Sequence, residues 1–122
     1  MMPIRASKLG GVARWQALGR LKGGVMNKTE AAYAAILEGR KLAGEVVWWA
    51  FEPFKIRLAA RTFYDVDFGL MLADGRLEVH EVKGSYAAPD SLVKLKIAAE
   101  HFPAPFFLAR LVRKAWTVEA VR

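Results

Sequence analysis

The sequence predicts a mixed α/β domain in which helices pack on a central β-sheet. Three observations favour this class. A capped, alanine-rich helical segment precedes four short segments of strand character, two of these are joined by a hairpin signal, and a second helical segment separates them from two more strands. With 122 residues, 54% of them hydrophobic, the chain suits one domain with a proper core.

The first helix is expected to begin after Asn27 and to end near Ala43. Asn27-Lys28-Thr29-Glu30 resembles a capping box, with Asn27 as the N-cap and Glu30 at the third helical position. The alanine-rich stretch that follows favours a helix, and Gly44 suits its C-terminal end.

Strands are predicted from residue 46 onward. Residues 46–51 and 54–61 form one pair joined around Pro53, and residues 64–72 and 76–83 form another pair joined by Ala73-Asp74-Gly75. Asp90 is expected to cap a second helix that runs to about His101, before Pro103 and Pro105. Two last strands are expected at 106–112 and 116–121, so the order is helix, four strands, helix, two strands.

The positive charge of the chain is concentrated at its N-terminus. The formal net charge is +7, and residues 1–26 hold five bases and no acid. These bases are Arg5, Lys8, Arg14, Arg20 and Lys22. Such asymmetry favours a polyanionic partner, because each base that meets a phosphate releases condensed counterions, although a solvated tail would have the same composition. We therefore divide the chain into a basic arm, residues 1–26, and a folded domain, residues 27–122.

Several classes of protein are excluded by composition. No apolar run approaches the ~18 residues that a membrane-spanning helix needs, and no apolar stretch near the N-terminus is long enough for a signal sequence. The absence of cysteine excludes disulfides and thiolate metal sites. We expect a cytoplasmic protein without a membrane partner. Scarce asparagine and glutamine hint at a thermophilic source.

Charged residues continue an apolar stripe on the second strand of the hairpin. Alternation places Leu77, Val79, Glu81 and Lys83 on one face, and the two apolar residues indicate that this face is buried. If Ala73-Asp74-Gly75 forms a three-residue loop, Asp67 lies opposite Glu81 and Asp65 lies opposite Lys83, with Cβ atoms of opposed residues ~5 Å apart. A two-residue loop would instead place Phe68 opposite Glu81 and separate the two acids.

Two carboxylates this close repel each other unless a divalent cation lies between them. Oxygen ligands suit Mg²⁺ or Mn²⁺, and Lys83 could then stabilise a hydroxide for attack on phosphorus. An ordinary Asp/Glu/Lys ion cluster at a strand end is an equally good interpretation of the spacing alone. In that case the chain would be a non-catalytic DNA-binding protein that uses its basic arm.

The same residues resemble the PD-(D/E)XK nuclease superfamily. The resemblance rests on Val66-Asp67, then thirteen residues, then Glu81-Val82-Lys83, with Glu30 in the preceding helix. Val66 stands where the signature has proline. Within the superfamily, Tyr64-Asp65-Val66-Asp67-Phe68 and His80-Glu81-Val82-Lys83-Gly84 are similar to small phage and archaeal-type Holliday-junction resolvases, including phage endonuclease I-like proteins.

This resemblance implies a restriction-endonuclease-like core and a magnesium-dependent DNA endonuclease, most simply a homodimer that cuts four-way junctions in a phage or prokaryotic host cell. A nuclease of the same superfamily that acts on linear or nicked DNA is the alternative. By resemblance, Asp67, Glu81 and the Val82 carbonyl hold the metal. Lys83 orients the nucleophilic water, and Glu30 assists from the first helix, although a pure capping role for Glu30 competes.

Lys96, His80 and His101 have ordinary structural explanations. Lys96 lies on the Leu92 side of the second helix and is a candidate phosphate contact, although a lysine whose stem covers apolar surface is as good an explanation. His80 alternates away from Glu81 and is expected to be structural. His101 ends a helix, where a contact with the helix dipole is sufficient.

Overall fold

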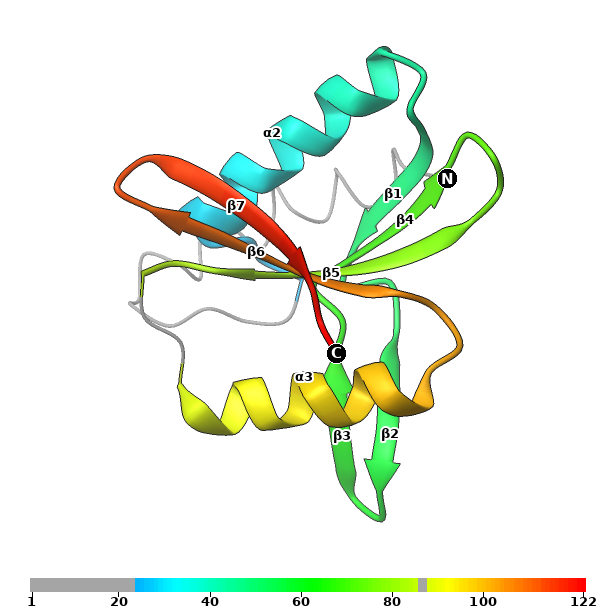
Figure 1. Cartoon of the computed structure of the whole chain (residues 1–122), viewed down its shortest axis with the longest axis vertical. Coiled ribbons are helices and arrows are strands. Elements are labelled where there is room, and N and C mark those ends of the chain that lie inside the picture. Colours follow the sequence, from blue (N-terminus) through cyan, green and yellow to red (C-terminus); the bar gives the residue numbers. More distant parts are fainter. Residues whose placement is uncertain (1–23, 86–87) are drawn as a thin grey trace.

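The computed structural model of the chain describes residues 24–85 and 88–122, and the elements carry the labels of Figure 1. Helix α2 (Lys28–Leu42) is followed by five strands: β1 (Val46–Phe51), β2 (Lys55–Ala59), β3 (Thr62–Asp65), β4 (Phe68–Leu72) and β5 (Leu77–Lys83). Helix α3 (Pro89–His101) comes next, and then β6 (Phe106–Val112) and β7 (Ala115–Ala120). No helix in this part of the chain is long and apolar enough to cross a membrane.

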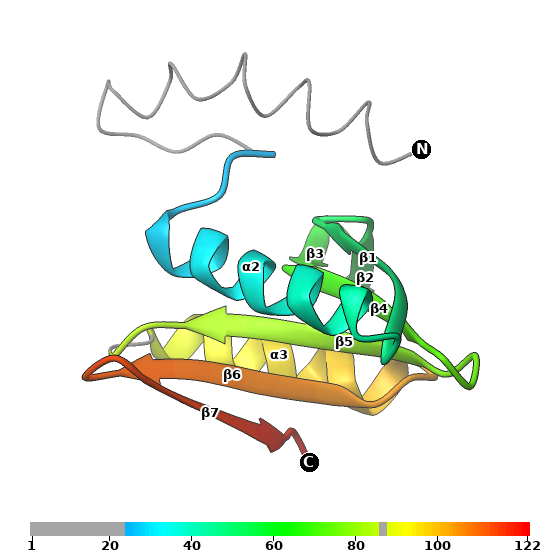
Figure 2. The same cartoon turned by 90° about the horizontal axis from the view of Figure 1, so that it is seen from above.

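The central sheet has five strands in the order β1-β4-β5-β6-β7. Strands β5 and β6 are parallel, and the other neighbours are antiparallel. Helix α2 lies on one face of the sheet and α3 on the other, as Figure 2 shows from above. The predicted class, a mixed central sheet flanked by helices with a helix–strands–helix–strand core, is confirmed.

Helix α2 begins at the predicted capping box. The Asn27 side chain accepts a hydrogen bond from the Glu30 N–H at 2.8 Å, and Glu30 Oε1 accepts one from the Asn27 N–H at 2.9 Å. Tyr33, Ala34 and Leu37 form the buried stripe of the helix. Because two otherwise unpaired donors are satisfied at its start, the first turn of α2 is held in place.

The start of α3 differs from expectation. Asp90 was the expected N-cap, but Ala88 occupies this position without a side-chain hydrogen bond, and Pro89 is the first helical residue. Proline suits this position, because its fixed φ is already helical and its missing N–H would have had no partner inside the helix. Asp90 lies instead in the first turn, where its charge interacts favourably with the helix dipole.

The hairpin between β4 and β5 has the predicted three-residue loop. Phe68 pairs with His80 and Gly69 with Val79, and the Leu72 N–H donates to the Arg76 carbonyl at 2.8 Å. Gly75 has a φ of 89°, in the left-handed region that glycine adopts without strain. The register on which the convergence of Asp67 and Glu81 depends is therefore confirmed.

The expected single strand over residues 64–72 is wrong. The structure divides it into β3, which pairs with β2 in a separate two-stranded sheet, and β4, which pairs with β1 and β5. Asp65 consequently lies opposite Lys55 and not opposite Lys83. The chain changes partner at Val66, which is buried and whose N–H donates to the Phe54 carbonyl. Residue alternation carries no information about which strand is the partner, so it could not reveal the break.

Strand β5 is buried on both faces, not on one. Val82 belongs to the hydrophobic cluster between the sheet and α2, while Val79 belongs to the hydrophobic cluster between the sheet and α3. His80 is only 2% exposed. The reason is the position of β5 as the third of five strands with a helix on each face of the sheet.

Candidate active site

Three elements bring acidic residues together at the end of β5. Asp67 immediately precedes β4, Glu81 lies on β5, and Glu30 lies in the first turn of α2. Continuing the β4–β5 register by one residue beyond the Phe68–His80 pair places Asp67 across from Glu81. The negative charges of Glu81 and Glu30 both act on Asp67. The fold thus places Asp67 and Glu81 side by side, and Glu30 lies near enough for its charge to act on Asp67.

Asp67 is held against the backbone of β5. Its Oδ2 accepts a hydrogen bond from the Val82 N–H at 2.9 Å. Burial and, after it, the charge of Glu81 raise the pKa of the Asp67 carboxyl to about 8, against the smaller opposing effects of Val82 and Lys83. An ionised Asp67 is therefore costly in this environment unless a further cation is present.

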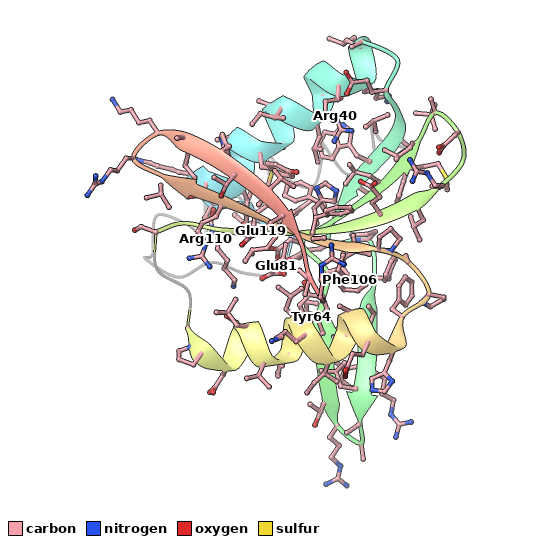
Figure 3. All side chains as sticks on the ribbon, viewed as in Figure 1. Arg40, Tyr64, Glu81, Phe106, Arg110 and Glu119 are labelled. Atoms are coloured by element: carbon pink, nitrogen blue, oxygen red, sulfur yellow. The ribbon has the colours of Figure 1, made fainter. Side chains whose placement is uncertain are left out.

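Glu81 has a different set of partners. Its Oε1 accepts a hydrogen bond from the Tyr64 hydroxyl, and its Oε2 lies 3.0 Å from Lys83 Nζ. The residue is 4% exposed, and Figure 3 shows Tyr64 and Glu81 in the space between the sheet and α3. Burial and the neighbouring Glu81 raise the pKa of Tyr64, so its hydroxyl stays a proton donor. The two contacts fix the orientation of the Glu81 carboxylate.

Sequence reasoning did not single out Tyr64. Its hydroxyl reaches Glu81 because β3 leaves the plane of the central sheet and pairs with β2, and this departure was not expected. No local pattern in the sequence marks such a contact between residues seventeen positions apart.

Glu30 serves the capping box and also lies near the acidic residues. Its Oε1 serves the capping box, whereas its Oε2 forms no hydrogen bond or ion pair within residues 24–85 and 88–122. Burial raises the pKa of Glu30, and the charges of Glu52 and Glu81 act in the same direction. The cap therefore positions a carboxylate at the border of the acidic cluster.

Two bases lie beside the acids. Lys83 on β5 pairs in parallel register with Arg110 on β6, and paired residues of neighbouring strands point to the same face of a sheet. Arg110 is half-buried, on the same side of the sheet as Glu81 in Figure 3. Sequence reasoning missed Arg110, since nothing local fixes the register of two parallel strands joined through a helix.

The carboxylate and carbonyl oxygens at this edge of β5 are ligand types that a small divalent cation takes. Within a strand, the N–H and C=O of one residue point to the same edge. Because the Val82 N–H meets Asp67, the Val82 carbonyl faces that edge too. No group of three or more Asp, Glu or His side chains in the described part of the chain is arranged to hold a metal. Two carboxylates and one carbonyl, completed by water, are the kind of partial ligand set that Mg²⁺ accepts.

The remaining candidates are Lys96, the bases of the arm and His80. Lys96 is exposed on α3. The five bases of the arm, Arg5, Lys8, Arg14, Arg20 and Lys22, fall outside the described residues. His80 faces away from Glu81 as expected: its Nδ1 lies 2.6 Å from the Tyr33 hydroxyl and its Nε2 lies 2.9 Å from Glu78 Oε1. Burial lowers the pKa of His80, which favours a neutral structural role.

Comparisons with known proteins found similar solved structures only. No protein-family model matches the chain, and no curated protein matches it. Hjc from Archaeoglobus fulgidus, described as a Holliday junction resolvase from an archaeal hyperthermophile, is 16% identical over 75% of this chain and 76% of its own, with a TM-score of 0.49. The crystal structure of SSO0001 is 16% identical over 98% of this chain and 62% of its own, with a TM-score of 0.44.

Proposed function

We propose that the chain is a metal-dependent DNA endonuclease that hydrolyses phosphodiester bonds at the cluster of Asp67, Glu81 and Lys83. The observation that carries this proposal is the approach of a half-buried carboxylate, Asp67, whose pKa is raised to about 8, to the buried carboxylate of Glu81. Lys83 Nζ lies 3.0 Å from Glu81 Oε2. Such an arrangement lowers the stability of the folded state, so a structural ion cluster does not explain it well. It is typical of a site that binds a cation and an anionic substrate.

Each residue has a distinct part in this mechanism. Asp67, Glu81 and the Val82 carbonyl are the proposed ligands of Mg²⁺, for which Mn²⁺ can substitute. A cation held there would supply Lewis-acid polarisation of the scissile phosphate and would lower the pKa of a bound water molecule. Lys83 donates to the attacking water or hydroxide and keeps it oriented, while Arg110 neutralises phosphate charge on the same face. Glu30, positioned by its cap, accepts a hydrogen bond from water at the border of the site.

Among DNA substrates we propose branched DNA, most specifically the four-way junction. Support comes from the resemblance of residues 64–68 and 80–84 to small junction resolvases. We further propose that the enzyme acts as a homodimer in the cytoplasm, since two-fold symmetry lets two active sites meet two strands of a junction.

A paired cleavage assay tests this proposal. We expect cleavage of a labelled four-way junction with Mg²⁺, at least ~10-fold less cleavage of a linear duplex of the same sequence, and no cleavage with EDTA. Equal cleavage of the two substrates would favour a nuclease for linear or nicked DNA. Binding without cleavage under all metal conditions would leave a non-catalytic DNA-binding protein.

Replacing Tyr64 with Phe is expected to slow cleavage by about 10- to 100-fold and to raise the Mg²⁺ concentration needed for half-maximal rate. The substitution removes the hydroxyl that orients Glu81 and keeps the buried ring. Titration of cleavage rate against Mg²⁺ measures both effects, with thermal unfolding as the control for folding. An unchanged magnesium requirement in a folded variant would contradict the positioning role.

A further inference from the structure

The hairpin of β2 and β3 is a separate two-stranded sheet that extends past α3 in Figure 1. Its inner side carries Ile56 and Leu58, which pack on the core cluster under α3. Its outer side carries four exposed residues, Lys55, Arg57, Phe63 and Asp65. One side of the hairpin thus fixes it to the domain, and the other side is free for contact with a partner.

An exposed aromatic ring lies among bases on this outer side. Phe63 is 42% exposed and pairs across the hairpin with Arg57. Lys55 Nζ lies 5.7 Å from the centre of the Phe63 ring and 3.6 Å from Asp65 Oδ1. The side chain of Arg57 forms no hydrogen bond or ion pair in the described part of the chain. Bases combined with an exposed ring are typical of surfaces that contact nucleic-acid backbones and stack on bases or sugars.

Arg61 at the tip of the hairpin is a second feature that favours a nucleic-acid partner. It has a φ of 59°, in the left-handed region that glycine and asparagine adopt more readily. Its side chain, like that of Arg57, has no hydrogen bond or ion pair within residues 24–85 and 88–122. Arg61 therefore places a positive charge at the tip of the hairpin that the turn geometry does not require.

The base of the hairpin is joined to the candidate active site. The Glu52 N–H donates to the Asp67 carbonyl at 2.7 Å, and Tyr64 on β3 donates to Glu81. A cavity of about 280 Å³ lies at this junction, lined by Glu52, Phe54, Lys55 and Asp65. A five-residue strand spans roughly 15 Å from this base to the tip, a length that covers about four phosphates of one DNA strand.

We propose that the outer face of the β2–β3 hairpin is a DNA-contacting surface formed by Lys55, Arg57, Arg61 and Phe63. This surface binds the DNA strand that continues from the phosphate bound at Asp67 and Glu81. Arg57 and Arg61 contact backbone phosphates, and Phe63 stacks on a sugar or on a base left unpaired at a branch. The proposal rests on the proposed function for the position of the DNA, but it makes its own prediction about binding.

The test compares two double variants of the full chain with the same change in net charge. Arg57→Gln/Arg61→Gln removes both bases of the hairpin. Lys41→Gln/Arg76→Gln removes two bases from the end of α2 and the β4–β5 turn, which lie at the opposite end of the molecule in Figure 1. Binding of a fluorescein-labelled four-way junction is measured in EDTA from 50 to 200 mM salt. We expect the hairpin variant to bind about 10- to 100-fold more weakly with a salt slope lower by about 2, and the control variant to bind within about threefold of wild type.

A single substitution separates binding from folding. Arg61→Gly relieves the left-handed backbone, so we expect its melting temperature to be unchanged or higher while it binds the junction about 3- to 10-fold more weakly. Unchanged affinity and salt slope in the hairpin double variant, or an equal loss in the control, would overturn the proposal.

The outcomes for the hairpin and for catalysis are distinguishable. If wild type shows no metal-dependent cleavage, the proposed nuclease function fails, whereas weaker binding by the hairpin variant still supports the DNA-contacting surface. If the hairpin variant cleaves saturating DNA at the wild-type rate and binds with unchanged affinity, the surface is overturned and the nuclease function stands.

Discussion

Replacing Asp67 with Asn, or Glu81 with Gln, is expected to abolish metal-dependent DNA cleavage while DNA binding stays intact or becomes stronger. Each change removes one negative charge from a site that faces phosphates and weakens its hold on a divalent cation. Lewis-acid stabilisation by a metal is worth several kcal/mol, so its loss corresponds to at least ~10³-fold in rate. Single-turnover cleavage of a four-way junction measures the rate, and binding of the same junction in EDTA measures affinity.

The melting temperature of Asp67→Asn provides a control for folding, and its change with pH has an expected sign. Burial and Glu81 raise the pKa of Asp67 from its ordinary value to about 8. A carboxyl whose pKa is raised in the folded state costs no stability below its unfolded pKa. The cost grows as the pH rises from the unfolded pKa to the folded pKa, because only the unfolded state releases the proton there, and it is constant above the folded pKa. Asparagine removes the charge and can still accept the Val82 N–H. We therefore expect the metal-free variant to melt several degrees higher than wild type at pH 9, with a much smaller difference at pH 5.

A folded variant that still cleaves at near-normal rate would remove the proposed site. Addition of Mg²⁺ gives a second check, because a ligand that binds only the folded state raises the melting temperature. We expect this rise in wild type and a much smaller one in Asp67→Asn. An equal rise in both proteins would mean that the cation binds elsewhere.

Removing residues 2–23 is expected to weaken DNA binding by about 10²- to 10³-fold at 150 mM salt, because five bases that can neutralise phosphates are lost. The deletion leaves Gly24, whose N–H donates to Glu52, and Val25, which is buried. The folded domain should therefore keep its melting temperature. The salt dependence of binding should become flatter by up to about 4 units of slope.

A matched control separates the effect of the arm's charge on DNA binding from the effect of its length. Changing Arg5, Lys8, Arg14, Arg20 and Lys22 to Gln in the full chain should reproduce the loss of affinity and slope. If the deletion weakens binding but the charge variant does not, the arm acts in another way, such as dimerisation. Unchanged affinity in both variants would leave the hairpin of β2 and β3 and the acidic site to account for DNA binding.

The sequence alone determined the elements whose signals are local. The capping box at Asn27 and Glu30 and the three-residue loop closed by Gly75 each depend on a few neighbouring residues, and both are present. The loop length then fixed the register of β4 and β5, and with it the approach of Asp67 to Glu81. Chemistry that depends on a single hairpin could therefore be predicted from sequence.

Only the tertiary structure decided which strands pair across longer separations. Alternation is the same whichever strand a segment pairs with, so it did not show that β3 leaves the central sheet for β2. This departure brings the Tyr64 hydroxyl to Glu81 and leaves the bases of the hairpin on a free face. The parallel register of β5 and β6, which places Arg110 beside Lys83, is likewise set by the packing of α3 and not by any turn.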